Sequence, residues 1–300
     1  MVDGQFIPQR VFAEQLPNGF YDFSCHFIIN EESDSKFDLI DWEIKSNSGE
    51  SILNSNTSSS SNVFQIAAVL PPSFDGGVLE VSVSSNGDTS RYEKQIELLQ
   101  QQIEFILPLS GSALIVVGHR ISEVHRSALQ IHSQQFAWDF LGLADETLSI
   151  VNIDQSKPLT ASDFPGFGME VIAPADGEIV EARDGVDDIE VIGQLPEDMS
   201  YFLEDLTRAL GNFVIIKHAE SVFSVLAHLK RDSLLVDKGK EIRKGNAVGS
   251  LGNSGFTSGP HLHFHAMDGS DILSASALPI IMALEEGSYS PQAGEIVSNA

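Results

Sequence analysis

Hydrophobic and polar residues alternate along much of the first 110 residues, the pattern of β-strands with one buried face. The clearest case runs from Tyr21 to Ile29, where every second side chain is apolar. Further strands are predicted over residues 36–44, 63–70 and 77–84, while residues 92–107 fit either a helix or an extended segment. The Ser- and Asn-rich stretch 46–62 predicts an exposed loop or local disorder. We therefore expect a β-sandwich-like accessory domain over residues 1–110.

The character of the chain changes at Ser112, where an apolar strand is followed by a polar connection and then by the segment FAWDF. If that segment is extended, Phe136, Trp138 and Phe140 share one face and Asp139 lies on the other. The pattern therefore predicts a strand with three aromatic rings on one face and with Ala137 and Asp139 on the other.

Between residues 170 and 285 the predicted strands are short and separated by glycine turns, which favours a compact antiparallel β domain. Apolar residues at three- and four-residue steps from Met199 to Leu210 predict one amphipathic helix, ended by Gly211. The expected fold is therefore mainly β, with a compact antiparallel β domain over residues 111–285 that contains one or two short helices. Residues 286–300 are expected to form a C-terminal tail.

The stretch PHLHFH, Pro260 to His265, alternates in the same way but places histidines at the polar positions. In a strand, His261, His263 and His265 would share one face, because successive side chains point to opposite sides. Imidazoles on one face of a rigid strand suit metal ligation and proton transfer. A half-buried strand whose histidines only face water remains the simpler alternative.

Charge and cysteine content narrow the range of partners. The chain has 17 basic and 43 acidic residues, a net charge of −26, which argues against a nucleic-acid partner and against anionic membrane surfaces. The single cysteine, Cys25, excludes an internal disulfide framework and is expected to be a small core residue. No apolar run is long enough for a transmembrane segment, and the N-terminal residues show no signal-peptide pattern.

The candidates for a catalytic metal site come from four separate segments: His125, Asp139, His228, His261 and His263. Zinc in a hydrolase typically takes three protein ligands from His and Asp or Glu and keeps one position for water. The ion lowers the pKa of that water to about 7, and nearby imidazoles can move protons or stabilise an oxyanion. Composition and spacing alone do not divide these roles among the five residues.

Three pieces of the chain resemble the M23 zinc metallopeptidases of the lysostaphin or LytM type: Ala227-His228-Leu229, the glycine-rich run from Gly245 to Gly259, and Pro260-His261-Leu262-His263-Phe264. The resemblance extends over about half of the chain and leaves the N-terminal region uncovered. It implies a zinc-dependent endopeptidase that hydrolyses peptide bonds in peptidoglycan. Members of the family usually work in the cell envelope or outside the cell, which the missing signal-peptide pattern does not support.

Matched residue by residue, the resemblance implies that His263 and Asp139 are zinc ligands and that His228 and His261 are catalytic. The family often has a further histidine ligand four residues before the aspartate, but this chain has Gln135 there. Some members instead carry a His-Arg pair well upstream, which points to His125; the alternatives that remain are His132 and, more distantly, His119.

Two other functions are weighed against the enzyme. A catalytically inactive M23-like scaffold that binds cell wall or activates another murein hydrolase is the main alternative, because some relatives keep the fold and lose ligands. A lipoyl- or biotinyl-like carrier domain is disfavoured because no Met-Lys-Met-type hairpin is present. The bond that is cut, the role of the N-terminal domain and the oligomeric state are not indicated by the sequence.

Overall fold

The computed structural model describes residues 2–30, 39–57, 61–119, 124–127, 130–143, 157–194, 202 and 204–299. These residues form two compact units, one up to Gln100 and one from Gln101 onward. The fold is mainly β in both units, as the alternation predicted. Among the described residues, no helix has the length and apolar character needed to cross a bilayer.

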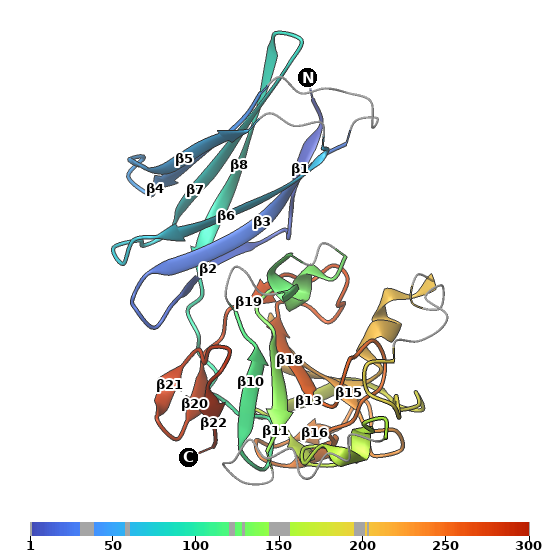
Figure 1. Cartoon of the computed structure of the whole chain (residues 1–300). Helices are drawn as coiled ribbons and strands as arrows, with labels where there is room; N and C mark the ends of the chain where they lie inside the picture. Colours follow the sequence, from blue (N-terminus) through green and yellow to red (C-terminus); the bar gives the residue numbers. More distant parts are fainter. Residues whose placement is uncertain are drawn as a thin grey trace. The chain divides into compact units, whose positions relative to one another are not determined.

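The first unit is built from β1 (Gly4–Ile7), β2 (Val11–Gln15), β3 (Tyr21–Ile29), β4 (Leu39–Ser46), β5 (Ser51–Thr57), β6 (Val63–Leu70), β7 (Gly77–Ser85) and β8 (Asp88–Leu98). Strand β3 pairs with β1, β2 and β6, and β2 continues the sheet by pairing in parallel with β8, followed by β7, β4 and β5 (Figure 1). Apolar side chains of β3 pack against those of β4, β7 and β8, which forms the core of the predicted sandwich-like unit.

Two expectations for this unit are wrong. Residues 51–57, expected in a loop, form β5, which pairs with β4 and keeps exposed Ser and Asn side chains at the sheet edge. Pairing with a neighbour decides this strand, because its own residues do not favour one. Strand β3 also buries its polar face: Asp22, Ser24 and His26 are all almost fully inaccessible.

The second unit contains a nine-stranded sheet whose central strands follow the order β13 (Gly177–Arg183), β14 (Asn212–Ala219), β15 (Val222–Leu229), β18 (Leu262–Met267), β11 (Trp138–Gly142) and β10 (Ala113–Val117). Its short outer strands are β16 (Glu241–Ile242), β19 (Ala277–Leu278) and β22 (Ile296–Val297). Every pairing in this sheet is antiparallel, as predicted for the domain. Segments more than a hundred residues apart therefore lie side by side at β11 and β18 (Figure 1).

Two small sheets complete this unit: β12 (Glu170–Ile172) pairs with β17 (Ala247–Ser250), and β20 (Met282–Leu284) pairs with β9 (Phe105–Ile106) and β21 (Gly287–Tyr289). Four 3₁₀ turns are described, η1 (Val124–Ser127), η2 (His132–Gln134), η3 (Ala161–Asp163) and η4 (Leu206–Leu210), and Phe202 and Glu204 are α-helical. The described part of the expected tail, residues 286–299, supplies β21 to the three-stranded sheet and β22 to the nine-stranded sheet.

Within the amphipathic helix predicted from Met199 to Leu210, Phe202 and Glu204 are α-helical, and Leu206–Leu210 form the 3₁₀ turn η4. Asp205 accepts a hydrogen bond from the backbone N–H of Thr207 and so begins the turn only five residues before Leu210. Gly211 ends it with φ of +63°, as predicted for a glycine that closes a helix. Met199 and Leu203 lie outside the described residues.

Candidate metal centre

Asp139 of β11 and His263 of β18 are direct cross-strand partners. Their side chains share one face of the sheet, and Nδ1 of His263 lies 3.0 Å from Oδ1 of Asp139. The neighbours Trp138 and Phe140 are fully buried on the opposite face, which is the division that the FAWDF alternation predicted. The carboxylate and the imidazole are thus brought together by regular strand pairing.

A second imidazole reaches the other oxygen of the carboxylate. Nε2 of His125, in η1, lies 3.1 Å from Oδ2 of Asp139. The ligand atoms of His125, Asp139 and His263 all lie within 4.8 Å of one another, and among the described residues they are the one such group of three or more. His132 and His119 do not belong to it, and the His119 ring lies against Trp138 with centroids 3.7 Å apart.

His228 enters the same group through a break in the pairing of β15. Between Leu226 and Leu229 this strand has one more residue than β14 opposite it, and His228 adopts φ of +60°. Regular alternation would send its side chain away from the face of Ala227, which pairs with His263. The bulge instead places its ring 4.7 Å from that of His261 and 5.8 Å from that of His263, measured between centroids.

Hydrogen bonds to backbone carbonyls fix the tautomers of His228 and His261. Nδ1 of His228 donates to the carbonyl oxygen of Ser254 at 2.8 Å, and Nδ1 of His261 donates to that of Gly259 at 2.8 Å. A carbonyl only accepts, so when neutral each ring carries its proton on Nδ1 and leaves Nε2 with a free lone pair. Nε2 of His261 lies 3.6 Å from Oδ1 of Asp139.

The loop that supplies the Ser254 carbonyl is clamped to the sheet. Oγ of Ser254 donates to the carbonyl of Leu229 at 2.7 Å and accepts from the backbone N–H of Asn212 at 2.9 Å. Gly211 passes so close that a Cβ there would lie 2.4 Å from the Ser254 backbone. This glycine is needed for its positive φ and for this close approach, and both keep the partner of His228 in place.

Asp139, His228 and His263 are buried, and burial affects the pKa of each of them. Burial raises the pKa of the Asp139 carboxyl, but the charges of His261 and His125 and the hydrogen bonds from His125 and His263 outweigh it, so the pKa lies well below its usual range. Burial holds the pKa of His228 well below its ordinary value, helped by the neighbouring His261 and His263. An ionised Asp139 carboxylate therefore lies in the same group as a neutral His228 imidazole.

Two further residues support this group. Nδ1 of the fully buried His265 lies 2.9 Å from Nε2 of His263, on the shared strand face that the alternation predicted. The hydroxyl of Thr257 lies 3.2 Å from Nδ1 of His261. Sequence reasoning did not single out Thr257, because a threonine in a glycine-rich loop carries no signal of its own.

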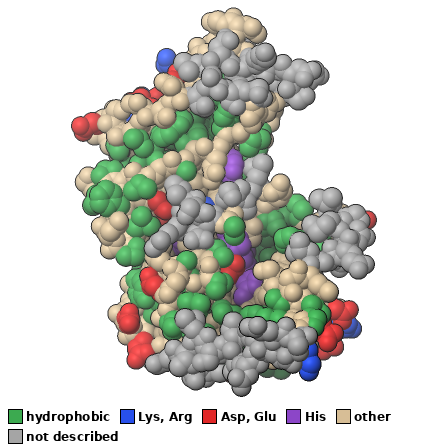
Figure 2. Space-filling view, viewed as in Figure 1, with side chains coloured by type: hydrophobic (Ala, Val, Ile, Leu, Met, Phe, Trp, Pro, Cys, Tyr) green, Lys and Arg blue, Asp and Glu red, His purple; other side chains and the backbone are tan. Residues whose placement is uncertain are grey.

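The arrangement offers two imidazole nitrogens and one carboxylate for a metal ion, with two more imidazoles presenting lone pairs beside it. Figure 2 shows histidine side chains meeting at the surface next to an acidic side chain. Such a set can hold a divalent cation and accept protons from a group bound next to it.

Residues 160–274 match the model of peptidase family M23. The matched range includes His228, His261 and His263, while Asp139 and His125 precede it. The peptidoglycan DD-endopeptidase ShyC of Vibrio cholerae is 32% identical over 107 residues, which are 36% of this chain and 21% of that protein. The murein hydrolase activator NlpD of Escherichia coli K12 is 31% identical over 97 residues, 32% of this chain and 19% of that protein.

The chain thus spans about a fifth of the length of these curated relatives. Among solved structures, the antimicrobial peptidase lysostaphin from Staphylococcus simulans aligns with a TM-score of 0.32 at 18% identity, over 55% of this chain and 47% of that one.

Proposed function

We propose, from the premise that the chain belongs to peptidase family M23, that it is a zinc-dependent endopeptidase that hydrolyses peptide bonds in peptidoglycan. The observation that carries the proposal is the position of Asp139 between Nε2 of His125 and Nδ1 of His263, at 3.1 and 3.0 Å. That substrate lies in the cell envelope, so we propose this location for the protein as well.

The three residues fit a zinc ion. Two imidazoles and one carboxylate are a typical ligand set of catalytic zinc. Donor atoms held roughly 2.1 Å from a tetrahedral ion lie about 3.4 Å apart. The two His–Asp separations here are 3.1 and 3.0 Å, and all three ligand atoms lie within 4.8 Å of one another. His125, Asp139 and His263 would hold the ion, which when bound lowers the pKa of a water molecule and polarises the scissile carbonyl.

His228 and His261 supply the proton transfers. Their Nδ1 protons are tied to the carbonyls of Ser254 and Gly259, so each presents the Nε2 lone pair as a proton acceptor. The low pKa of His228 keeps that ring neutral before reaction. Whichever imidazole takes the proton of the attacking water becomes a donor, and it can then stabilise the developing oxyanion or protonate the leaving amine.

Digestion of purified peptidoglycan tests this function, with released fragments followed by chromatography. We expect the wild-type protein to contain about one zinc ion per chain and to release fragments. His261→Ala should release none while keeping its zinc, and His263→Ala should lose both. His218→Gln is the matched control, because His218 is hydrogen-bonded to Ser224 and the Asp176 carbonyl outside the metal centre.

The match to a murein hydrolase activator favours a second candidate, a scaffold without activity of its own. The same digestion separates the two. If neither wild type nor His261→Ala releases fragments and both sediment with peptidoglycan, the protein is a scaffold without peptidase activity. If wild-type protein stays metal-free after incubation with zinc, the proposal of a zinc-dependent endopeptidase is wrong.

A further inference from the structure

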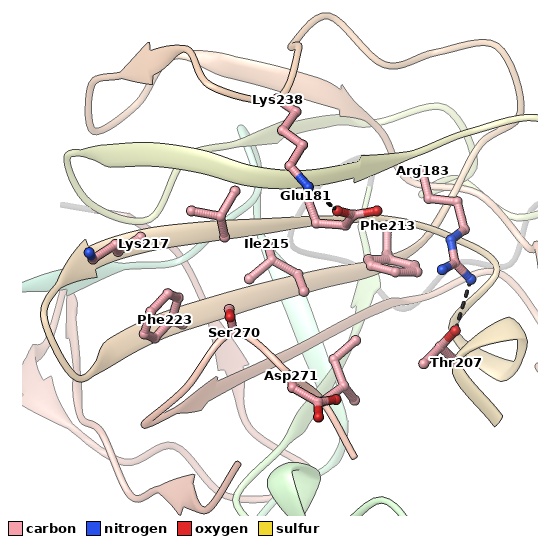
Figure 3. A pocket seen from close by; sticks show the side chains of 12 residues that line it. Glu181, Arg183, Thr207, Phe213, Ile215, Lys217, Phe223, Lys238, Ser270 and Asp271 are labelled. Atoms are coloured by element: carbon pink, nitrogen blue, oxygen red, sulfur yellow. Dashed lines mark hydrogen bonds and ion pairs between the residues drawn. The ribbon is translucent and has the colours of Figure 1, made fainter. Parts of the chain in front are cut away.

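A cavity of about 410 Å³ lies on the second unit where β13, β14 and β15 run side by side (Figure 3). Its floor is formed by Phe213 and Ile215 of β14 and Phe223 of β15. The edges come from β13, from η4 and from the loop at residues 270–272. Its volume falls in the range of small-ligand sites.

This cavity is separate from the metal centre although both lie on the same face of the sheet. Phe223 is four residues before Ala227 on β15, and Ala227 pairs with His263. At about 3.3 Å per residue, the two levels are roughly 13 Å apart along the strand. Val225, Leu210 and Ile272 pack with the floor residues in one hydrophobic cluster, so the floor is apolar.

The acidic side chains at the edge are already engaged. The carboxylate of Glu181 accepts from Nζ of Lys238 at 2.9 Å. The carboxylate of Asp271 accepts from the backbone N–H of Leu273 at 3.0 Å and from Oγ of Ser274 at 2.7 Å. Neither carboxylate therefore needs a cationic ligand.

Three cations line the cavity, and two of them, Lys217 and Arg183, keep N–H groups for a ligand, whereas Lys238 is paired with Glu181. Lys217 is exposed and makes no ion pair with any described residue, including Glu178, its cross-strand neighbour. Arg183 lies 4.8 Å from the centroid of Phe213. Its Nη1 donates to Oγ1 of Thr207 at 2.8 Å and lies 3.7 Å from Oδ2 of Asp205, which leaves the N–H groups of Nε and Nη2 for a ligand. In Figure 3 these two cations stand at opposite ends of the floor made by Ile215 and Phe213.

We propose that this cavity binds a short acidic peptide. Lys217 and Arg183 hold its carboxylates, and its aliphatic groups rest on the apolar floor. Arg183 pairs with Phe213 across the strands, and Lys217 is four residues further along β14, so the two cations are about 13 Å apart at the backbone. An extended peptide with acidic residues four positions apart matches that distance. The net charge of −26 disfavours unspecific attachment of an anion elsewhere.

The proposal is independent of catalysis, so metal-free full-length protein serves for the test. Two capped peptides are compared, acetyl-Glu-Ser-Val-Ser-Glu-amide and its neutral analogue with Gln in place of both Glu residues. Binding is followed by NMR of isotope-labelled isoleucine methyl groups. We expect saturable shifts at Ile215 and Ile272, with an affinity for the acidic peptide about tenfold higher than for the neutral one.

Lys217→Gln should weaken binding of the acidic peptide about tenfold. Lys240→Gln, which removes an exposed lysine outside the cavity, should leave it unchanged. Both side chains are exposed, and equal unfolding midpoints would verify that the fold is kept. Equal affinity for the two peptides, the absence of shifts at Ile215 and Ile272, or an equal loss in both lysine variants would overturn the proposal.

Discussion

Nε2 of His263 and Nδ1 of His265 lie 2.9 Å apart in the interior of the second unit, and His265 is fully buried. The other nitrogen of His263 faces Asp139. Once that nitrogen ligates a metal ion, the remaining proton of His263 is on Nε2, and His265 is the group that accepts it. A buried side chain two residues along the strand thereby fixes the tautomer of the ligand.

We predict that His265→Leu weakens zinc binding by about 10- to 100-fold, because the Nε2–H of His263 loses its acceptor. His265→Asn should retain most of the affinity, since its side-chain oxygen lies near the position of Nδ1. Competition with a chromophoric chelator measures the affinities, and circular dichroism checks the fold. Equal affinities of the Leu and Asn variants would show that the hydrogen bond has no orienting role.

Thr257 is predicted to position His261 without touching the metal ligands. Its hydroxyl lies 3.2 Å from Nδ1 of His261 and donates to the carbonyl of Gly259 at 2.8 Å, which the same Nδ1 also contacts. Thr257→Val keeps the shape and removes the hydroxyl, so kcat should fall about tenfold while zinc content and KM stay constant. The control is Thr89→Val in β8 of the first unit. A fall in zinc content would instead place Thr257 among the residues that support the metal.

Cys25 is predicted to be inert in the folded protein. It is fully buried in the core of the first unit, and burial raises the pKa of its thiol to about 12. The native state therefore keeps the proton at about pH 8, where an unfolded thiol begins to ionise and react. A chromogenic disulfide reagent should titrate no thiol before denaturant is added and one afterwards. Rapid reaction without denaturant would mean that this core opens easily.

The raised thiol pKa also gives the sign of a pH effect. Because the native state binds the proton more tightly than the unfolded chain, the contribution of Cys25 to stability is complete below the unfolded pKa. It is lost as the pH rises toward the folded pKa of about 12. Comparison of Cys25→Ala with wild type over the alkaline range isolates this contribution.

The sequence pattern was enough to predict strands and the faces of their side chains, because the two-residue period of a strand determines the direction of each side chain. The alternation at Tyr21–Ile29 predicted β3, and FAWDF predicted that Trp138 and Asp139 lie on opposite faces of a strand. The same rule placed His263 and His265 together. These inferences need only a strand period of two residues and a hydrophobic core.

The features that the sequence did not predict depend on contacts between distant segments, which a local sequence pattern does not encode. His228 reaches the metal centre through a bulge with positive φ, where strict alternation would have turned it away. Spacing alone left His119, His125 and His132 open, since the path of the connection between β10 and β11 decides which imidazole approaches Asp139. The polar strand β5 was missed because its pairing with β4 overrides weak strand propensity.

Gly211 links the stability of the second unit to the position of His228. It adopts φ of +63°, and a Cβ there would lie 2.4 Å from the backbone of Ser254, whose carbonyl holds Nδ1 of His228. Gly211→Ala should therefore lower the free energy of unfolding by about 2 to 4 kcal/mol, more than left-handed strain alone. Displacement of Ser254 should also reduce peptidase activity.

Gly239→Ala is the matched control, because Gly239 has φ of +83° with no atom within 4 Å of the added Cβ. It should cost only the conformational strain, about 1 to 2 kcal/mol, and leave activity unchanged. Urea denaturation and peptidoglycan digestion of both variants measure the two effects. If Gly211→Ala were no more destabilising than Gly239→Ala and equally active, the close approach to Ser254 would have no part in holding His228.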